Sequence, residues 1–276
     1  MANLLDTHFH LDYIQDLDQR HLFIERLLEK EIQLVGQTVL PSQFVKLHEW
    51  YQGVYQDHQD KLWISLGFHP WHIGNQAQID KELSIFSQYM RQYHHIGEIG
   101  LDFSSKRLEI TPKETQIQVF ERILKMIQTH IHQERQSRPY LLSIHAVKSA
   151  TVLMDILESL GAYSDQCVPI IHRFNGTSDE LTRHIRLGGY FSIHPIMLTT
   201  KKGRAYIQQI PGNRILLESD LPQQPILDEA LESPQVYQEL YTQVKASIEE
   251  SLQSISLLRG ENTLKQVLSN QAQLFK

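Results

Sequence analysis

Short apolar runs alternate with amphipathic stretches along most of the chain. The runs have the length and β-rich composition of buried strands, and the stretches between them carry apolar residues at helical spacing. Strands are predicted for the run that ends near His8 and for residues 32–39, 61–67, 95–101, 139–145, 168–172, 189–193 and 214–218. Helices are predicted for residues 17–31, 41–55, 77–92 and 148–160, and for a long helix that ends near residue 133.

Two sequences have the signature of a helix start. Thr111-Pro112-Lys113-Glu114 and Thr177-Ser178-Asp179-Glu180 each place a threonine three residues before a glutamate, which predicts a capping box. In the first, the proline takes the first helical position, and the long helix to about residue 133 would begin there. The tail from about residue 228 to 275 is rich in glutamine and glutamate and is predicted to be helical, with one break at Gly260.

Eight strands with intervening helices predict an α/β protein with a (β/α)8 TIM-barrel fold. An open, doubly wound parallel sheet has the same alternation and is the alternative. No repeat or linker divides the chain, so residues 1–276 are expected to form a single domain, with the C-terminal helices (about 228–275) packed on the barrel. A length of 276 residues is ordinary for one such barrel.

Composition narrows the class of protein. With 41% hydrophobic and 21% charged residues, the chain is expected to be a soluble globular protein, and its longest apolar runs are too short to cross a membrane. We see no secretory signal, and the single cysteine, Cys167, excludes an intramolecular disulfide, so a cytoplasmic protein is expected. A net charge of −6 argues against a protein that coats nucleic acid non-specifically.

Histidines and carboxylates follow several predicted strands. His8 and His10 are two residues apart at the end of the first strand, so both side chains can point to one spot. In a barrel the carboxyl ends of the strands face one cavity, where four further residues would join them: Glu98, His145, His172 and Asp220. Each residue alone has an ordinary explanation, such as a buried, hydrogen-bonded histidine. Together the six favour a divalent metal site, because buried ionisable groups are costly unless paired or metal-bound.

Six ligands are enough for two metal ions. Two ions roughly 3.5–4 Å apart with a bridging carboxylate suit displacement at phosphorus. Glu98 is the natural bridge, and Asp220 could bind the first ion and orient the attacking water, so these two residues are the candidate catalytic groups. Zn²⁺, Mg²⁺ and Mn²⁺ all remain candidates.

Several motifs together resemble the TatD family of metal-dependent hydrolases from residue 3 to about 222. They are Asp6-Thr7-His8-Phe9-His10-Leu11, Gly67-Phe68-His69-Pro70, Gly97-Glu98-Ile99-Gly100-Leu101-Asp102, His145, His172-Arg173-Phe174-Asn175-Gly176 and Leu217-Glu218-Ser219-Asp220. The resemblance implies a cytoplasmic, metal-dependent deoxyribonuclease or other phosphoester hydrolase. It also implies that His8, His10, Glu98 and Asp220 hold one metal and that Glu98, His145 and His172 hold the other. His69 would contact substrate phosphate or an additional ion.

The chain departs from the family pattern around the substrate. An Arg-Asp stretch commonly follows the strand-five histidine, whereas here the sequence is His145-Ala146-Val147-Lys148. Arg173 replaces a common cysteine, and Leu221-Pro222-Gln223-Gln224-Pro225 replaces an Ala-Pro sequence and a later loop. His194-Pro195 adds a histidine at the end of strand seven. The metal ligands therefore look intact while the substrate-facing residues are altered.

Substrate contacts are assigned to His69, His194 and a set of basic residues. Lys201, Lys202 and Arg204, expected in the loop after strand seven, could form a basic rim with Arg173, Lys148, Lys106 and Arg107, or could be ordinary solvated residues. Trp71 could stack on a base or pack against the rim of the barrel.

Three functions are consistent with the sequence. The first is a metal-dependent deoxyribonuclease, such as a 3′ exonuclease on single-stranded ends. The second is hydrolysis of another ester, either an aminoacyl-tRNA ester or a small phosphoester. The third is a subunit of a multiprotein defence or nucleic-acid-processing system whose partners present the substrate. The oligomeric state is left open.

Overall fold

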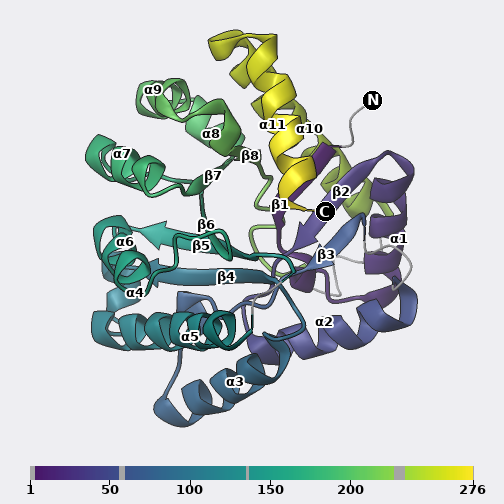
Figure 1. Ribbon diagram of the computed structural model, residues 1–276. Coiled ribbons are helices and arrows are strands. Elements are labelled where there is room, and N and C mark those ends of the chain that lie inside the picture. The colour runs from purple at the N-terminus through teal and green to yellow at the C-terminus, as the bar shows by residue number, and fades with distance from the viewer. Residues whose placement is uncertain (1–3, 56–59, 135–136, 227–233, 276) are drawn as a thin grey trace. The chain divides into compact units, whose positions relative to one another are not determined.

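The computed structural model describes residues 4–55, 60–134, 137–226 and 234–275 (Figure 1). The chain divides into two compact units, each described by itself. Unit 1 comprises Met1–Gln37, Leu47–Trp63 and Ser192–Lys276, and unit 2 comprises Thr38–Lys46 and Ile64–Phe191.

Unit 1 contains parallel strands from both ends of the chain. β1 (Leu4–Phe9), β2 (Ile32–Gly36) and β3 (Leu62–Ile64) pair in that order, with only the last residue of β3 assigned to unit 2. β8 (Ile215–Leu217) lies in the same unit. The residues that follow β8 pair with β1, because Asp220 N–H donates to the His8 carbonyl at 2.9 Å and His10 N–H donates to the Leu221 carbonyl at 2.7 Å.

Unit 2 is organised around a second set of parallel strands. β4 (His95–Asp102), β5 (Tyr140–Val147) and β6 (Cys167–His172) pair in sequence order. β7 (Tyr190–Ile193) follows β6, and its last two residues belong to unit 1. Most apolar residues of these strands are buried, although Val147 at the end of β5 is exposed. The long helix α5 packs along β4 (Figure 1).

Each described strand is followed along the chain by one or two described helices. Their bounds are α1 Leu17–Glu29, α2 Pro41–Val54, α3 Gln76–Tyr89, α4 Ser105–Leu108, α5 Lys113–Gln133, α6 Ala150–Ser159, α7 Ser178–Arg186, α8 Pro195–Leu198, α9 Lys201–Gln209, α10 Pro234–Arg259 and α11 Glu261–Leu274. Single 3-10 turns lie at η1 Leu11–Tyr13, η3 Pro70–His72 and η4 Gly212–Arg214. The predicted alternation of strand and helix is confirmed, and none of the described helices is long and apolar enough to span a membrane.

One predicted capping box is confirmed and the other is wrong. The Thr177 hydroxyl accepts from the Glu180 N–H, and the Glu180 carboxylate accepts from the Thr177 N–H. At the start of α5 the cap residue is Pro112, and no side chain caps the helix. The Thr111 hydroxyl is buried and donates to the Ile73 carbonyl at 3.0 Å, so a tertiary contact takes the place of the cap.

The C-terminal helices belong to unit 1. Gly260 separates α10 from α11 with a φ of 85°, a backbone conformation that favours glycine, so the predicted break is confirmed. Residues 228–233 of the predicted helical tail lie outside the described residues. On α11, Asn270 donates to the Ile215 carbonyl at 3.0 Å and Gln271 donates to the Leu5 carbonyl at 2.7 Å. The last helix is thereby tied to both β8 and β1.

Candidate functional site

In unit 1, His8, His10 and Asp220 form a cluster of metal-ligating side chains. The two imidazole rings lie 5.1 Å apart between centroids and are nearly perpendicular. The Nε2 atoms of His8 and His10 lie 3.5 and 3.3 Å from one carboxylate oxygen of Asp220. All three side chains are buried. The structure therefore brings together these three of the residues predicted from the sequence.

A buried carboxylate, Asp6, fixes the backbone on both sides of this cluster. It accepts hydrogen bonds from the N–H of His8 at 3.1 Å and from both the N–H and the hydroxyl of Ser219. Burial raises the pKa of Asp6 to about 7, although the hydrogen bonds from Ser219 and His8 act to lower it. One partner is the backbone of the ligand His8, and the other, Ser219, is the residue before the ligand Asp220. Asp6 therefore sets the position of β1 relative to the ligand after β8.

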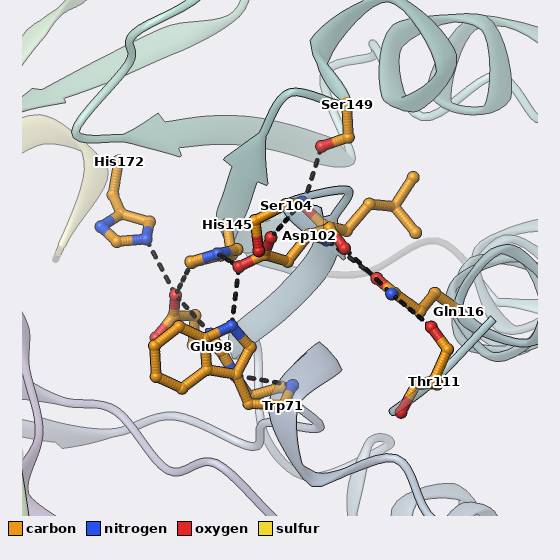
Figure 2. A network of polar contacts seen from close by, with 11 residues as sticks. Trp71, Glu98, Asp102, Ser104, Thr111, Gln116, His145, Ser149 and His172 are labelled. Atoms are coloured by element: carbon orange, nitrogen blue, oxygen red, sulfur yellow. Dashed lines mark hydrogen bonds and ion pairs between the residues drawn. The ribbon is translucent and has the colours of Figure 1, made fainter. Parts of the chain in front are cut away.

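In unit 2, three histidines surround one carboxylate oxygen of Glu98, and Figure 2 shows two of them, His145 and His172. His145 Nδ1 and His172 Nε2 each lie 2.8 Å from Oε1, and His69 Nε2 lies 3.2 Å from it. Glu98 comes from β4, His145 from β5 and His172 from β6, and His69 follows β3. Burial acts to raise the pKa of Glu98, but His69 and His172 and hydrogen bonds from the histidines hold it well below its ordinary value.

His145 also reaches a second carboxylate. Its Nε2 lies 3.2 Å from Oδ2 of Asp102, and the same oxygen accepts from the indole N–H of Trp71 at 2.7 Å. Asp102 Oδ1 accepts from the Ser104 N–H at 2.8 Å. Burial alone would lower the pKa of His145, but the hydrogen bonds to Asp102 and Glu98 raise it. A histidine ligand whose other nitrogen faces a carboxylate is typical of metal sites.

The tautomer of His69 follows from its hydrogen bonds. Its Nδ1 accepts from the Trp71 N–H at 3.0 Å, and burial lowers its pKa to about 4, so the ring is neutral at pH 7. Its Nε2 therefore carries the hydrogen and donates to Glu98. His194 in unit 1 repeats this arrangement, because its Nδ1 accepts from the Ile196 N–H at 3.1 Å next to Pro195. In both histidines Nδ1 is therefore the acceptor of a backbone N–H two residues further along the chain.

The distances within the two clusters resemble those between ligands of a divalent cation, and His69, Glu98 and His145 form a candidate ligand group within unit 2. Two ligand atoms at 2.0–2.1 Å from a tetrahedral ion lie about 3.4 Å apart, close to the 3.3 and 3.5 Å from Asp220 to His10 and His8. The 2.8 Å from Glu98 to His145 is close to the roughly 3.0 Å between neighbouring ligands of an octahedral ion. Imidazole and carboxylate without thiolate suit Zn²⁺, Mn²⁺ and similar ions.

The predicted substrate contacts are distributed over both units. Lys201 and Lys202 are exposed in the first turn of α9, so the predicted loop at this place is wrong. Arg204 donates to the carbonyls of Leu198 and Thr199, which ties α9 to α8. In unit 2, Arg173 is half-buried, whereas Lys148 and Lys106 are exposed. Substrate binding by Arg173, His194, Lys201 and Lys202 stays a prediction.

Sequence reasoning assigned no role to Asp102 or Asp6, although both lie in motifs that it singled out. Glu98, Gly100 and Asp102 are each two residues apart on β4, so they lie on the same face of the strand. This spacing was the signal in the sequence that Asp102 lies on the same side as Glu98. Asp6 precedes His8 by the same period on β1.

Solved structures define the class of fold. The crystal structure of a TatD family hydrolase from Entamoeba histolytica matches with a TM-score of 0.71 at 18% sequence identity, covering 99% of this chain and 98% of that chain. This likeness confirms the predicted α/β, TIM-barrel-like fold class.

Sequence comparisons define the family. The family described as TatD related DNase matches residues 5–276, so the chain belongs to this family and is a hydrolase. It is 27% identical over 241 residues to deoxyribonuclease TATDN3 of Homo sapiens, covering 80% of this chain and 78% of the human protein. It is 26% identical over 228 residues to the 3'-5' ssDNA/RNA exonuclease TatD of Pantoea ananatis, covering 79% of each.

Proposed function

We propose that this chain is a divalent-metal-dependent phosphodiesterase that hydrolyses nucleic acid, with single-stranded DNA ends as its preferred substrate. The observation that carries the proposal is the convergence of three imidazoles on one carboxylate oxygen of Glu98. Family relatives named as a deoxyribonuclease and as a 3'-5' ssDNA/RNA exonuclease support the choice of nucleic acid as substrate.

The proposed ligands are His8, His10, Glu98, His145, His172 and Asp220, which would act as one centre for two ions within a single-domain chain. Divalent ions held by these residues would lower the pKa of a bound water and would neutralise charge on the phosphate oxygens. This proposal combines the clusters of the two units through the family motifs and the barrel topology predicted from sequence.

The chain's own groups then have separate tasks. The carboxylate of Asp220 orients the attacking water and accepts its proton. The Nε2–H of His69, which donates to Glu98 when no substrate is bound, turns to a phosphate oxygen when the substrate enters, because its Nδ1 is already occupied by the Trp71 N–H. Arg173, His194, Lys201 and Lys202 hold the phosphates that flank the scissile bond.

Isosteric removal of charge tests the catalytic roles. Glu98→Gln and Asp220→Asn should each lower cleavage of labelled single-stranded DNA with Mg²⁺ or Mn²⁺ by about 10²–10⁴-fold while the protein stays folded. The matched control is Glu121→Gln, which changes an exposed carboxylate paired with Lys125 and should have no effect. Elemental analysis should find two ions per chain in the wild type and fewer in Glu98→Gln. Metal-loaded wild-type protein that leaves DNA intact would contradict the proposal.

A second candidate is hydrolysis of another ester at the same centre. The strand that carries His145 continues through Ala146 and Val147 to an exposed Lys148, where an Arg-Asp pair was expected from the family resemblance. A panel containing aminoacyl-tRNA and small phosphoesters, assayed beside DNA, distinguishes the two functions by the ratio of their kcat/KM values.

A further inference from the structure

We propose that Trp71 is a stacking platform for one unpaired nucleobase of the substrate, so that unit 2 selects single-stranded over paired nucleic acid. The inference rests on the proposed function and adds a substrate-selecting residue to it. It is carried by the exposure of the indole, by the way the ring is held, and by its place beside the Glu98 cluster.

Trp71 is unusually exposed for its size. The residue is 57% exposed, whereas Trp63 is 7% exposed. Tryptophan normally buries most of its large apolar surface, so an indole that is more than half exposed leaves apolar surface accessible to a ligand. The sequence allowed two roles for Trp71, stacking on a base or packing against the rim of the barrel. Packing alone leaves more than half of the residue exposed.

The exposed ring is nevertheless held in one position. Its N–H donates to the Asp102 carboxylate at 2.7 Å, and its backbone N–H donates to His69 Nδ1 at 3.0 Å. The edge-to-face contact with the His69 ring, at 5.6 Å between centroids, restrains it further. A ring fixed before binding loses little conformational entropy when a base stacks on it. The polar edge of the indole is thus occupied, and stacking on the ring face is the interaction left for a ligand.

The position of the ring suits a base attached to a reacting phosphate. Its centroid lies 6.4 Å from that of His145, which contacts Glu98, and Figure 2 shows the indole beside these residues. Val147, which pairs in register with Asp102 on the neighbouring strand, is 36% exposed and adds apolar surface.

Hydrogen bonds link a cationic residue of α4 to the segment that carries Trp71. The Arg107 guanidinium on α4 donates to the Thr111 hydroxyl, which in turn donates to the Ile73 carbonyl, two residues after Trp71. Lys106 on the same helix is exposed. Aromatic side chains beside positive charges are the usual means by which proteins hold single-stranded nucleic acid, whereas bases paired in a duplex do not offer a free face.

Two substitutions of Trp71 distinguish the contribution of the aromatic ring face from that of the indole N–H. Trp71→Ala should raise the KM and the Kd for a single-stranded oligonucleotide by about 5- to 150-fold, the equivalent of one base stack of about 1–3 kcal/mol. Trp71→Phe keeps an aromatic face without the N–H and should retain most of the affinity. Both variants lose the same hydrogen bond to Asp102, so bound metal should be equal in the two, and the difference between them should appear in KM much more than in kcat. The matched control is Leu257→Ala, which removes an 81% exposed apolar side chain from α10 and should leave Kd and KM unchanged.

Fluorescence provides a direct signature of stacking. Adding oligothymidylate to the wild-type protein should quench tryptophan emission, and the quenching should disappear in Trp71→Phe, which retains Trp50 and Trp63. If Trp71→Ala and Trp71→Phe lose metal and activity equally, Trp71 acts only through Asp102 and the platform is refuted. Equal affinity of wild type and Trp71→Ala for single strands also refutes it. A wild-type protein that neither binds nor cleaves any oligonucleotide refutes the proposed function itself.

Discussion

Replacing Asp102 by asparagine should weaken metal binding through His145. The two oxygens of Asp102 accept from the Ser104 N–H at 2.8 Å and the Trp71 N–H at 2.7 Å, and the second also faces His145 Nε2 at 3.2 Å. Asparagine has only one oxygen. In either orientation its NH2 group opposes an N–H donor, so at least one of these hydrogen bonds is lost, together with the charge that faces the imidazole.

The size of the effect follows from those contacts. A hydrogen bond to a charged group contributes about 1.5–3 kcal/mol, so one lost bond destabilises the oriented state of His145 by a comparable amount. Loss of a partner that orients a metal-ligating histidine typically lowers metal affinity or activity about 10–100-fold. We therefore expect Asp102→Asn to weaken metal binding in this range without unfolding the protein.

The assay is a calorimetric titration of metal-free protein with Zn²⁺ and Mn²⁺, followed by DNA cleavage at saturating metal. Asp80→Asn is the matched control, because it makes the same chemical change at an exposed carboxylate that pairs with Arg122. Circular dichroism of both variants verifies the fold. Metal affinity and cleavage equal to those of the wild type would show that Asp102 does not orient His145 for metal binding.

Three further predictions concern stability and reactivity. Ser219→Ala removes the hydroxyl that donates to the buried Asp6 and should lower the free energy of unfolding by about 1–3 kcal/mol in urea titrations; an unchanged midpoint and slope would contradict it. Burial raises the pKa of the Cys167 thiol to about 12, so mass spectrometry should find it unmodified by iodoacetamide at about pH 8 in the native protein and modified in urea. Thr177→Ala breaks the capping box with Glu180 and should cost about 1 kcal/mol, seen as a lower Tm than that of Thr182→Ala.

Both clusters of candidate metal ligands could be predicted from the sequence, because the prediction needed only the positions of the strands and the two-residue period along them. His8 and His10 lie two residues apart at the end of β1, and Asp220 follows β8, the last predicted strand. Strand geometry was therefore sufficient to expect these three side chains in one cluster. The same reasoning joined Glu98, His145 and His172, because the carboxyl ends of neighbouring parallel strands lie at one edge.

What the sequence did not predict depends on contacts through space. Trp71 and Asp102 are 31 residues apart, and no local pattern signals that an indole N–H meets that carboxylate. Thr111 has the pattern of a helix cap, yet its hydroxyl donates to Ile73, 38 residues earlier. The local pattern predicted the helix after Thr111 and the strand that ends at Asp102, but tertiary contacts determined which hydrogen-bond partners these side chains have.

The discontinuity of unit 1 has a consequence for the order of folding. Gln271 donates to the Leu5 carbonyl across 266 residues, and Ser219 donates to Asp6 across 213 residues, whereas most of unit 2 is the single stretch from Ile64 to Phe191. Contacts between distant residues form slowly, because closing long loops costs entropy before the contacts repay it. Unit 2 should therefore acquire its structure first. His8 and His10 are the first of the proposed ligands in the sequence, yet they should be among the last to reach their final positions, after α11 has packed on β1.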